Sequence, residues 1–144
     1  MPKEELLKLD NQICFPIYAV SRSITKLYRP LLQELNITYP QYLVLLVLWE
    51  VEVITLRDLG KKLYLDSGTL TPLLKRMEKM HLIKRERSVE DERVLFIKIT
   101  EKGLGMKEKA SKVPECLLKN IEVDINQLIR VKKEMDELLK KLNS

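Results

Sequence analysis

The sequence predicts a mainly α-helical fold with a small β-hairpin wing, in a winged helix-turn-helix arrangement. Helix formers such as leucine, lysine and glutamate dominate, whereas 4 glycines and 6 prolines in 144 residues leave little for the turns of an all-β protein. Apolar side chains recur every three or four positions over most of the chain, but alternate in two short stretches after residue 80. The length suits a single domain.

The composition excludes disordered proteins and membrane bundles. Hydrophobic residues make up 45% of the chain and charged residues 33%, which allows a buried core beneath a solvated surface. Charged side chains interrupt the apolar residues near the N-terminus, and the sequence has no apolar stretch of membrane-spanning length. We therefore expect a cytoplasmic protein.

Cysteine and histidine are too sparse and scattered for a metal site. Cys14 and Cys116 match no zinc-binding spacing, and His81 is the one histidine in the sequence. The sequence also shows no glycine-rich phosphate loop and no nucleophile–base pair of an enzyme. We expect a non-enzymatic protein without metal or cofactor, in which each cysteine is either inert packing or a redox-active thiol.

The first part of the chain predicts two helices. Apolar residues at steps of three or four predict one long helix over 6–31, broken near Pro30. Thr38 and Gln41 have the spacing of a capping box, which starts the next helix. That helix should run to about Glu50, and its apolar residues on every side predict a buried element.

A helix-turn-helix and a wing follow. Thr55 can cap a short helix that ends near Tyr64, and Asp66 can cap another helix over 69–80 with a polar outer face. Residues 82–87 and 94–99 have the alternation of two strands around a charged tip. Helical spacing resumes after the wing, is interrupted at Pro114 and continues from residue 121 to the C-terminus.

Positive charge is concentrated in these two motifs. The net charge is +5, and residues 55–100 carry 11 basic and 7 acidic side chains. A basic patch on such motifs is the electrostatic footprint of a protein that binds duplex DNA. A solvated face with no partner is the alternative interpretation of any basic stretch.

Two stretches resemble a known family. Similarity to the MarR family of winged helix-turn-helix repressors is carried by residues 64–103, YLDSGTLTPLLKRMEKMHLIKRERSVEDERVLFIKITEKG. Similarity to its OhrR-like branch, which senses organic hydroperoxides through one cysteine near the N-terminus, is carried by residues 9–50, LDNQICFPIYAVSRSITKLYRPLLQELNITYPQYLVLLVLWE. The resemblance implies an obligate homodimer whose recognition helices enter successive major grooves of a pseudo-palindromic operator.

The resemblance also implies how the chain is divided. N-terminal dimerisation helices occupy residues 1–38, the winged helix-turn-helix DNA-binding region 39–100, and C-terminal dimerisation helices 101–144. The first and last helices of the two subunits interlock in this family. The three regions would therefore form one intertwined structural domain.

The first turn of the recognition helix should face base edges. Hydroxyl groups can exchange hydrogen bonds with bases there, and threonine or proline carbons can touch a thymine methyl. Lys75 and Arg76, one turn later, should contact phosphates. Asp66 has the position of a cap, and a capping role is the alternative for Ser67 and Thr69. The residues expected at the bases are Ser67, Gly68, Thr69, Thr71 and Pro72.

The wing tip should contact the neighbouring minor groove. Arg93 resembles the family arginine that enters this groove, where a narrow A·T tract concentrates negative potential. Asp91, two positions earlier, should orient the tip.

Cys14 is the candidate sensing thiol. Tyr18 lies four residues later on the same helical face, and a phenol can donate a hydrogen bond to a thiolate and lower the thiol pKa. Tyr28 lies about 21 Å further along a straight helix, so it cannot reach Cys14 of its own chain. Across a two-fold axis, Tyr28 and Tyr39 of one subunit could reach Cys14 of the other, as the family resemblance also implies. A small buried hydrophobe is the alternative role for Cys14.

Two further residues bear on the thiol. We expect Cys116 to lie in a linker. In the two-cysteine members of the family, a residue in this region of the partner subunit forms a disulfide with the sensing cysteine. In one-cysteine members, a small thiol forms the disulfide instead. Pro16 would kink a helix that begins at the N-terminus of the chain. If the helix begins near residues 11–12, Pro16 is harmless and Cys14 lies close to the positive end of the helix dipole.

Together these features predict a dimeric DNA-binding repressor that senses organic hydroperoxides by oxidation of Cys14 and then releases its operator. The main alternative is a MarR-type repressor released by a small aromatic or phenolic effector. A peroxidase would need a recycling system that the sequence does not show, and a helical protein–protein adaptor would leave the charged wing tip unexplained.

Overall fold

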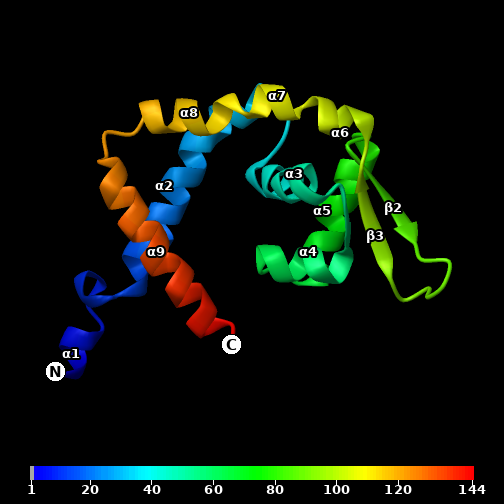
Figure 1. The fold of residues 1–144 in the computed structure, drawn as a ribbon. Helices are drawn as coiled ribbons and strands as arrows, with labels where there is room; N and C mark the ends of the chain where they lie inside the picture. Colours follow the sequence, from blue (N-terminus) through cyan, green and yellow to red (C-terminus); the bar gives the residue numbers. More distant parts are fainter. Residues whose placement is uncertain (1) are drawn as a thin grey trace. The chain divides into compact units, whose positions relative to one another are not determined.

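The computed structural model describes residues 2–144 (Figure 1). These residues form two compact units. The N-terminal unit ends at Val113, and the C-terminal unit comprises Pro114–Ser144. The N-terminal unit is helical apart from one small antiparallel sheet, and the C-terminal unit is helical. The mainly α-helical fold with a β wing is therefore confirmed.

The N-terminal helix differs from the prediction at its start and at Pro30. The long helix α2 (Cys14–Gln33) is preceded by a short helix α1 (Lys3–Leu6) and a 3₁₀ turn η1 (Leu9–Asn11). The predicted start of the long helix at residue 6 is therefore wrong. The side chain of Gln12 donates to two earlier carbonyl groups, at 2.7 and 2.9 Å, which stabilises the turns before α2. The predicted break at Pro30 is also wrong, because α2 continues through this residue and loses only one backbone donor there.

The central helix α3 (Tyr39–Val51) begins at the predicted capping box. The Thr38 side chain accepts a hydrogen bond from the Gln41 N–H at 3.4 Å, and the Gln41 side chain accepts one from the Thr38 N–H at 2.9 Å. The following helices α4 (Leu56–Leu63) and α5 (Ser67–Lys79) are the predicted helix-turn-helix. These local signals therefore place the three helices correctly.

The wing belongs to a sheet of three strands in the order β1-β3-β2. The predicted hairpin is formed by β2 (Ile83–Arg87) and β3 (Leu95–Ile99), which extend side by side to an exposed loop (Figure 1). The third strand, β1 (Val53–Thr55), was not predicted and pairs antiparallel with β3. Three residues between two helices are too short to show the alternation that identifies a strand.

The helices after the wing are shorter and more numerous than predicted. Pro114 lies inside a helix, and the interruptions fall at Met106 and Ser111 instead. The last helix begins four residues later than predicted, because the Asp124 side chain caps it by accepting from the N–H of Asn126 at 3.2 Å. The four helices are α6 (Glu101–Gly105), α7 (Lys107–Ala110), α8 (Lys112–Lys119) and α9 (Ile125–Leu142).

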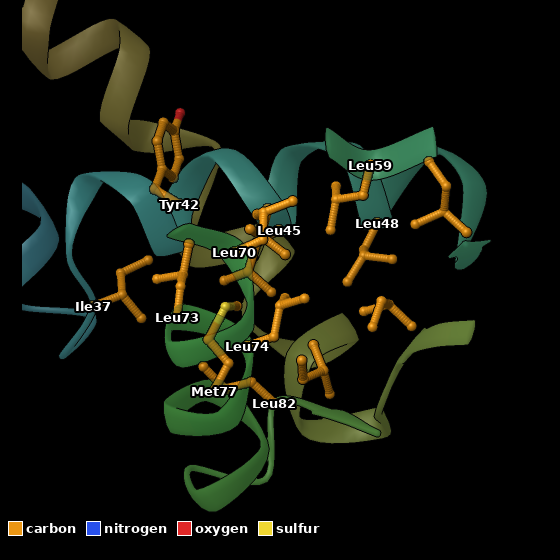
Figure 2. Close-up of a cluster of buried hydrophobic side chains, with 14 of the residues drawn as sticks. Ile37, Tyr42, Leu45, Leu48, Leu59, Leu70, Leu73, Leu74, Met77 and Leu82 are labelled. Atoms are coloured by element: carbon orange, nitrogen blue, oxygen red, sulfur yellow. The ribbon is translucent and has the colours of Figure 1, made fainter. Parts of the chain in front are cut away.

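One apolar core holds the helix-turn-helix against α3 (Figure 2). Leu45 and Leu48 of α3 meet Leu59 of α4 and Leu74 and Met77 of α5, and all five side chains are fully buried. Burial of a leucine-sized side chain contributes about 1.5–3 kcal/mol. The core therefore fixes α5, with its outer face free, at a defined orientation on α3.

Two long helices keep large apolar side chains exposed. On α2 these include Phe15, Ile17 and Val20, with exposed fractions of 43%, 40% and 52%. On α9, Ile125 and Ile129 are exposed by 54% and 61%. Large apolar side chains exposed on successive turns of a helix are typical of a protein–protein interface.

Replacing Gly103 by alanine should destabilise the N-terminal unit. A Cβ at Gly103 would lie 2.5 Å from the Leu82 carbonyl oxygen and 2.7 Å from Cγ1 of Ile99. Such overpacking lowers the free energy of unfolding by about 1–3 kcal/mol. Gly105→Ala is the matched control, because nothing lies within 4 Å of a Cβ there. Urea denaturation measures both variants, and equal stability would contradict this account of the packing.

Candidate functional site

The connection between α4 and α5 sets the position of α5, the second helix of the helix-turn-helix. Tyr64 adopts the left-handed conformation with φ 56° and ends α4. A Cβ on Gly60 would lie 2.7 Å from the Leu65 carbonyl oxygen, so the tight connection requires glycine. Asp66 then caps α5, as predicted: its Oδ1 accepts a hydrogen bond from the Thr69 N–H at 2.7 Å. This bond and one from the Thr69 hydroxyl hold the pKa of Asp66 below its usual range.

The structure brings the predicted DNA-binding residues of α5 to the surface of one helix. The opposite side of the helix is buried through Leu70, Leu73, Leu74 and Met77. Thr71 is partly buried, and its neighbours on the outer side are exposed. Because Pro72 has no N–H, the carbonyl of Gly68 receives no helical hydrogen bond from it. The exposed residues are Ser67, Gly68, Thr69, Pro72, Lys75 and Arg76.

The wing tip is built around Asp91. Its Oδ1 accepts hydrogen bonds from the Arg93 N–H at 3.0 Å and from Arg93 Nε at 3.1 Å, while Oδ2 accepts from Nη2 at 3.3 Å. The side-chain hydrogen bond from Arg93 is the main cause of the lowered pKa of Asp91. The Arg93 side chain is nonetheless 91% exposed. The tip therefore presents a guanidinium to solvent in an orientation that a carboxylate holds.

Cys14 occupies the first residue of α2 and is exposed. Pro16 is the third residue of the helix, where a backbone N–H has no helical acceptor, so the proline causes no kink. The helix begins two residues after the later of the two expected starts, so Pro16 falls within its first turn, as that alternative required. Cys14 therefore lies at the N-terminal end of α2. A buried packing role for Cys14 does not fit its exposure in this chain.

Three tyrosines form a cluster where α2 meets α3. The ring centroids of Tyr28 and Tyr39 are 4.9 Å apart, and those of Tyr28 and Tyr42 are 5.9 Å apart. Tyr42 was not predicted as a site residue, although its position three residues after Tyr39 places both on one helical face. Tyr18 lies elsewhere on α2, and its ring contacts the guanidinium of Arg22 at 5.5 Å.

Burial raises the pKa of these phenols further above neutral pH. It raises the pKa of Tyr28 to about 12, with smaller contributions from Tyr39 and Tyr42, and it also raises the pKa of the other two tyrosines. At neutral pH the cluster is therefore a set of hydroxyl donors. Such a set can donate to an anionic sulfur or oxygen placed beside it.

The tyrosine cluster is connected to the base of the wing through Trp49. The rings of Tyr42 and Trp49 are in edge contact, with centroids 6.3 Å apart. Trp49 Nε1 donates a hydrogen bond to the Gly103 carbonyl at 2.9 Å. Gly103 lies in α6, immediately after β3.

Cys116 lies within α8 and not in a linker, which corrects the prediction. Helical spacing continues through Pro114 because this residue is near the start of α8, where its missing N–H is tolerated. The Cys116 side chain is half-buried and its thiol is free. Cys14 and Cys116 belong to the two different compact units.

The described residues hold no group of three or more histidine, cysteine or acidic side chains that could bind a metal ion. Within the same part of the chain, none of the helices combines the length and apolar character needed to cross a membrane.

Comparison with known proteins identifies the family. The model of the family described as transcriptional regulator SarA/Rot matches residues 26–110, more than half of the chain. The chain is therefore a winged helix-turn-helix transcriptional regulator of the SarA/Rot and MarR type. This confirms the predicted family. The regulator shares 56% identity over 129 residues with the organic hydroperoxide resistance transcriptional regulator of Bacillus subtilis (strain 168), covering 88% of each chain.

Solved structures agree with this assignment. The regulator resembles reduced AbfR bound to DNA with a TM-score of 0.78 and 40% identity, covering 99% of this chain and 100% of that one. It also resembles disulfide-formed AbfR with a TM-score of 0.68 and 40% identity, covering 99% of this chain and 97% of that one. AbfR is a protein of Staphylococcus epidermidis. AbsC, a MarR family regulator from Streptomyces coelicolor, shares the fold with a TM-score of 0.79 at 24% identity, covering 95% and 97%.

The free energy of unfolding should fall as pH rises from about 10 to about 12. The unfolded phenol of Tyr28 ionises near its usual pKa of 10.0, whereas the folded protein holds the proton up to about 12. Below pH 10 this contribution to stability is fully present, and it is lost as pH rises through the folded pKa. Tyr28→Phe should remove this part of the pH dependence in urea denaturation. Equal pH dependence in the two proteins would contradict a raised pKa.

Proposed function

We propose that this protein is a homodimeric repressor that binds a pseudo-palindromic operator and releases it when organic hydroperoxide oxidises Cys14. The observation that carries the proposal is an exposed thiol at the N-terminus of α2 in a chain that also holds the protonated pair Tyr28 and Tyr39. Similarity to a regulator of organic hydroperoxide resistance supports the same oxidant. Because the partner is chromosomal DNA, we place this function in the cytoplasm.

The proposal requires a dimer for a geometric reason. Cys14 and Tyr28 lie in one continuous helix, so about 21 Å of helix separates them in a single chain. A second copy packed on the exposed apolar face of α2 can place its Cys14 beside Tyr28 and Tyr39. The exposed apolar residues of α9 provide further surface for the same dimer, in which residues 1–38 and 101–144 interlock around the 39–100 region.

The sensing chemistry uses the thiolate and the phenols. The Cys14 thiolate attacks one oxygen of the peroxide O–O bond; a sulfur–oxygen bond forms, the O–O bond breaks, and the alkoxide leaves as an alcohol after taking a proton. The product is a sulfenic acid on Cys14. The hydroxyl groups of Tyr28 and Tyr39 of the partner subunit donate hydrogen bonds to the sulfur before the reaction and to the peroxide oxygens during it. The thiol reacts once for each release of the operator, so the chain acts as a sensor without catalytic turnover.

DNA binding uses two exposed elements, the first turns of α5 and the tip of the wing, which together form the reading head of each subunit. The first turn of α5 faces base edges through Ser67, Gly68, Thr69, Thr71 and Pro72, while Lys75 and Arg76 hold phosphates. Arg93 enters the adjacent minor groove in the orientation that Asp91 sets. Oxidation at the dimer interface changes the spacing of the two reading heads, and the operator is released.

Cys116 is the proposed resolving thiol. Its sulfur attacks the Cys14 sulfenic acid of the other subunit, a disulfide forms and water leaves. The similarity to disulfide-formed AbfR supports a disulfide as one state of this regulator. The Cys116 thiol is free and half-buried in α8.

Peroxide should release DNA from the wild-type protein and not from Cys14→Ser. The probe is a labelled duplex that the reduced wild-type protein selects from a random-sequence pool, and binding is measured by fluorescence anisotropy at fixed salt. Cumene hydroperoxide should weaken wild-type binding by about tenfold or more, whereas the mutant should be unaffected because it lacks the reactive sulfur. Release of the duplex from both proteins would contradict thiol sensing. An effector without oxidising power that releases both would favour a small-molecule sensor.

Cumene hydroperoxide should also produce a covalent dimer on a non-reducing gel. This band should disappear in Cys116→Ser and in Cys14→Ser, because each removes one sulfur of the intersubunit disulfide. Persistence of the band in Cys116→Ser would reject Cys116 as the resolving thiol. A wild-type protein that releases DNA without a dimer band would show that release does not require the intersubunit disulfide.

A further inference from the structure

An acidic residue, Glu78, occupies an unfavourable position in the recognition helix. It lies in the last turn of α5, where the helix dipole favours basic side chains, and its neighbours Arg76 and Lys79 are basic. A carboxylate at this position also repels the phosphates that the basic residues of α5 are proposed to contact. Its presence there therefore needs another physical explanation.

The structure supplies a partner for both carboxylate oxygens of Glu78. Oε2 accepts a hydrogen bond from the backbone N–H of Arg85 at 3.0 Å, and Oε1 accepts from Nη2 and Nε of the same residue at 3.2 and 3.4 Å. The side chains of Arg85 and Glu78 are only 23% and 39% exposed. The hydrogen bond from the Arg85 N–H is the main cause of the lowered pKa of Glu78, so the carboxylate is ionised at neutral pH.

These hydrogen bonds join the recognition helix to the wing. Arg85 is the middle residue of β2, an edge strand of the sheet, and an edge strand has backbone N–H groups without a strand partner. Glu78 binds one of these N–H groups from α5. The wing is thus attached to α5 by a side chain as well as by the chain connection at residues 80–82.

The base of the wing has its own attachment. Thr100 donates through its hydroxyl to the His81 carbonyl at 2.6 Å and through its N–H to the Leu82 carbonyl at 3.1 Å. Lys102 Nζ donates to the Met80 carbonyl at 2.9 Å. These bonds hold the point where the hairpin leaves α5, and β1 holds one side of the hairpin by pairing with β3 from Phe96 to Lys98. The other side is the free edge of β2, and the hydrogen bonds between Glu78 and Arg85 join that edge to α5. Attachment on both sides restrains the tilt of the wing.

We propose that Glu78 is a positioning residue for DNA binding, which holds the wing at the angle where Arg93 and the first turn of α5 face one duplex. This inference rests on the proposed DNA-binding function and adds a residue that contacts no DNA itself. Without the Glu78 carboxylate, the wing samples several angles and Arg93 loses its preorganised position. The affinity that Arg93 contributes is then reduced by the cost of ordering the wing.

Glu86 provides a matched control for this proposal. It also lies on β2, and its carboxylate pairs with Lys98 at 2.7 Å, but this ion pair joins the two strands of the wing and does not reach α5. Glu78→Ala and Glu86→Ala each remove one negative charge from the reading head. Any general gain in attraction to phosphates is therefore shared by both variants.

The first experiment compares binding of the reduced variants to the duplex selected by the wild-type protein. Glu78→Ala should bind about tenfold more weakly than Glu86→Ala at the same salt concentration, because only the former frees the wing. Amide hydrogen exchange at Arg85 should be faster in Glu78→Ala alone. Glu78→Gln covers the case in which Glu78→Ala does not fold. It keeps the shape of the side chain and one acceptor oxygen, so it should bind DNA about threefold more weakly than Glu86→Gln.

A double-mutant cycle with Arg93→Ala separates positioning from a general loss of stability. If Glu78 acts by placing Arg93, the variant carrying both Glu78→Ala and Arg93→Ala should bind within about twofold of Arg93→Ala. Additive losses, or equal affinities of the Glu78 and Glu86 variants, would overturn the proposal while leaving the DNA-binding function intact. A wild-type protein that selects no duplex would overturn both.

Discussion

The rest of the structure depends on the apolar packing of α3 against the helix-turn-helix. Leu45 and Leu48, in the middle of α3, are fully buried against α4 and α5. The same helix begins at Tyr39 of the tyrosine cluster and ends close to Trp49, which is hydrogen-bonded to the Gly103 carbonyl. One buried helix therefore carries residues of the tyrosine cluster, of the core and of the contact with the base of the wing.

The chain divides its apolar residues between two uses. Most of those on α3, α4 and α5 form a closed core, which Leu32 near the end of α2 joins, whereas the large apolar residues in the first half of α2 and many on α9 are exposed. The thiol and the phenols are divided in the same way, since Cys14 lies at one end of α2 and Tyr28 near the other. Neither the apolar surface nor the proposed sensor is complete in one copy, and a dimer would complete both.

Local interactions could be predicted from the sequence, and contacts between distant residues could not. The caps at Thr38 and Asp66 were predicted because each involves residues three positions apart. Periodicity alone placed the start of α2 too early, because apolar spacing continues through residues 6–13 although that segment forms separate turns, and only Pro16 indicated a later start. In the candidate site, Cys14 and the exposed residues of α5 follow from motif and periodicity. Tyr42 and Glu78 do not, since their roles depend on how α2 and β2 pack against their helices.

The position of Trp49 has a practical consequence. It is the one tryptophan of the sequence, and its indole lies between the Tyr42 ring and a carbonyl of α6. Excitation of the neighbouring phenols can pass to the indole by energy transfer. The indole emission depends on the hydrogen bond that its N–H donates to the Gly103 carbonyl. The molecule therefore contains an intrinsic optical reporter at the junction between its tyrosine cluster and its wing, which needs no attached dye.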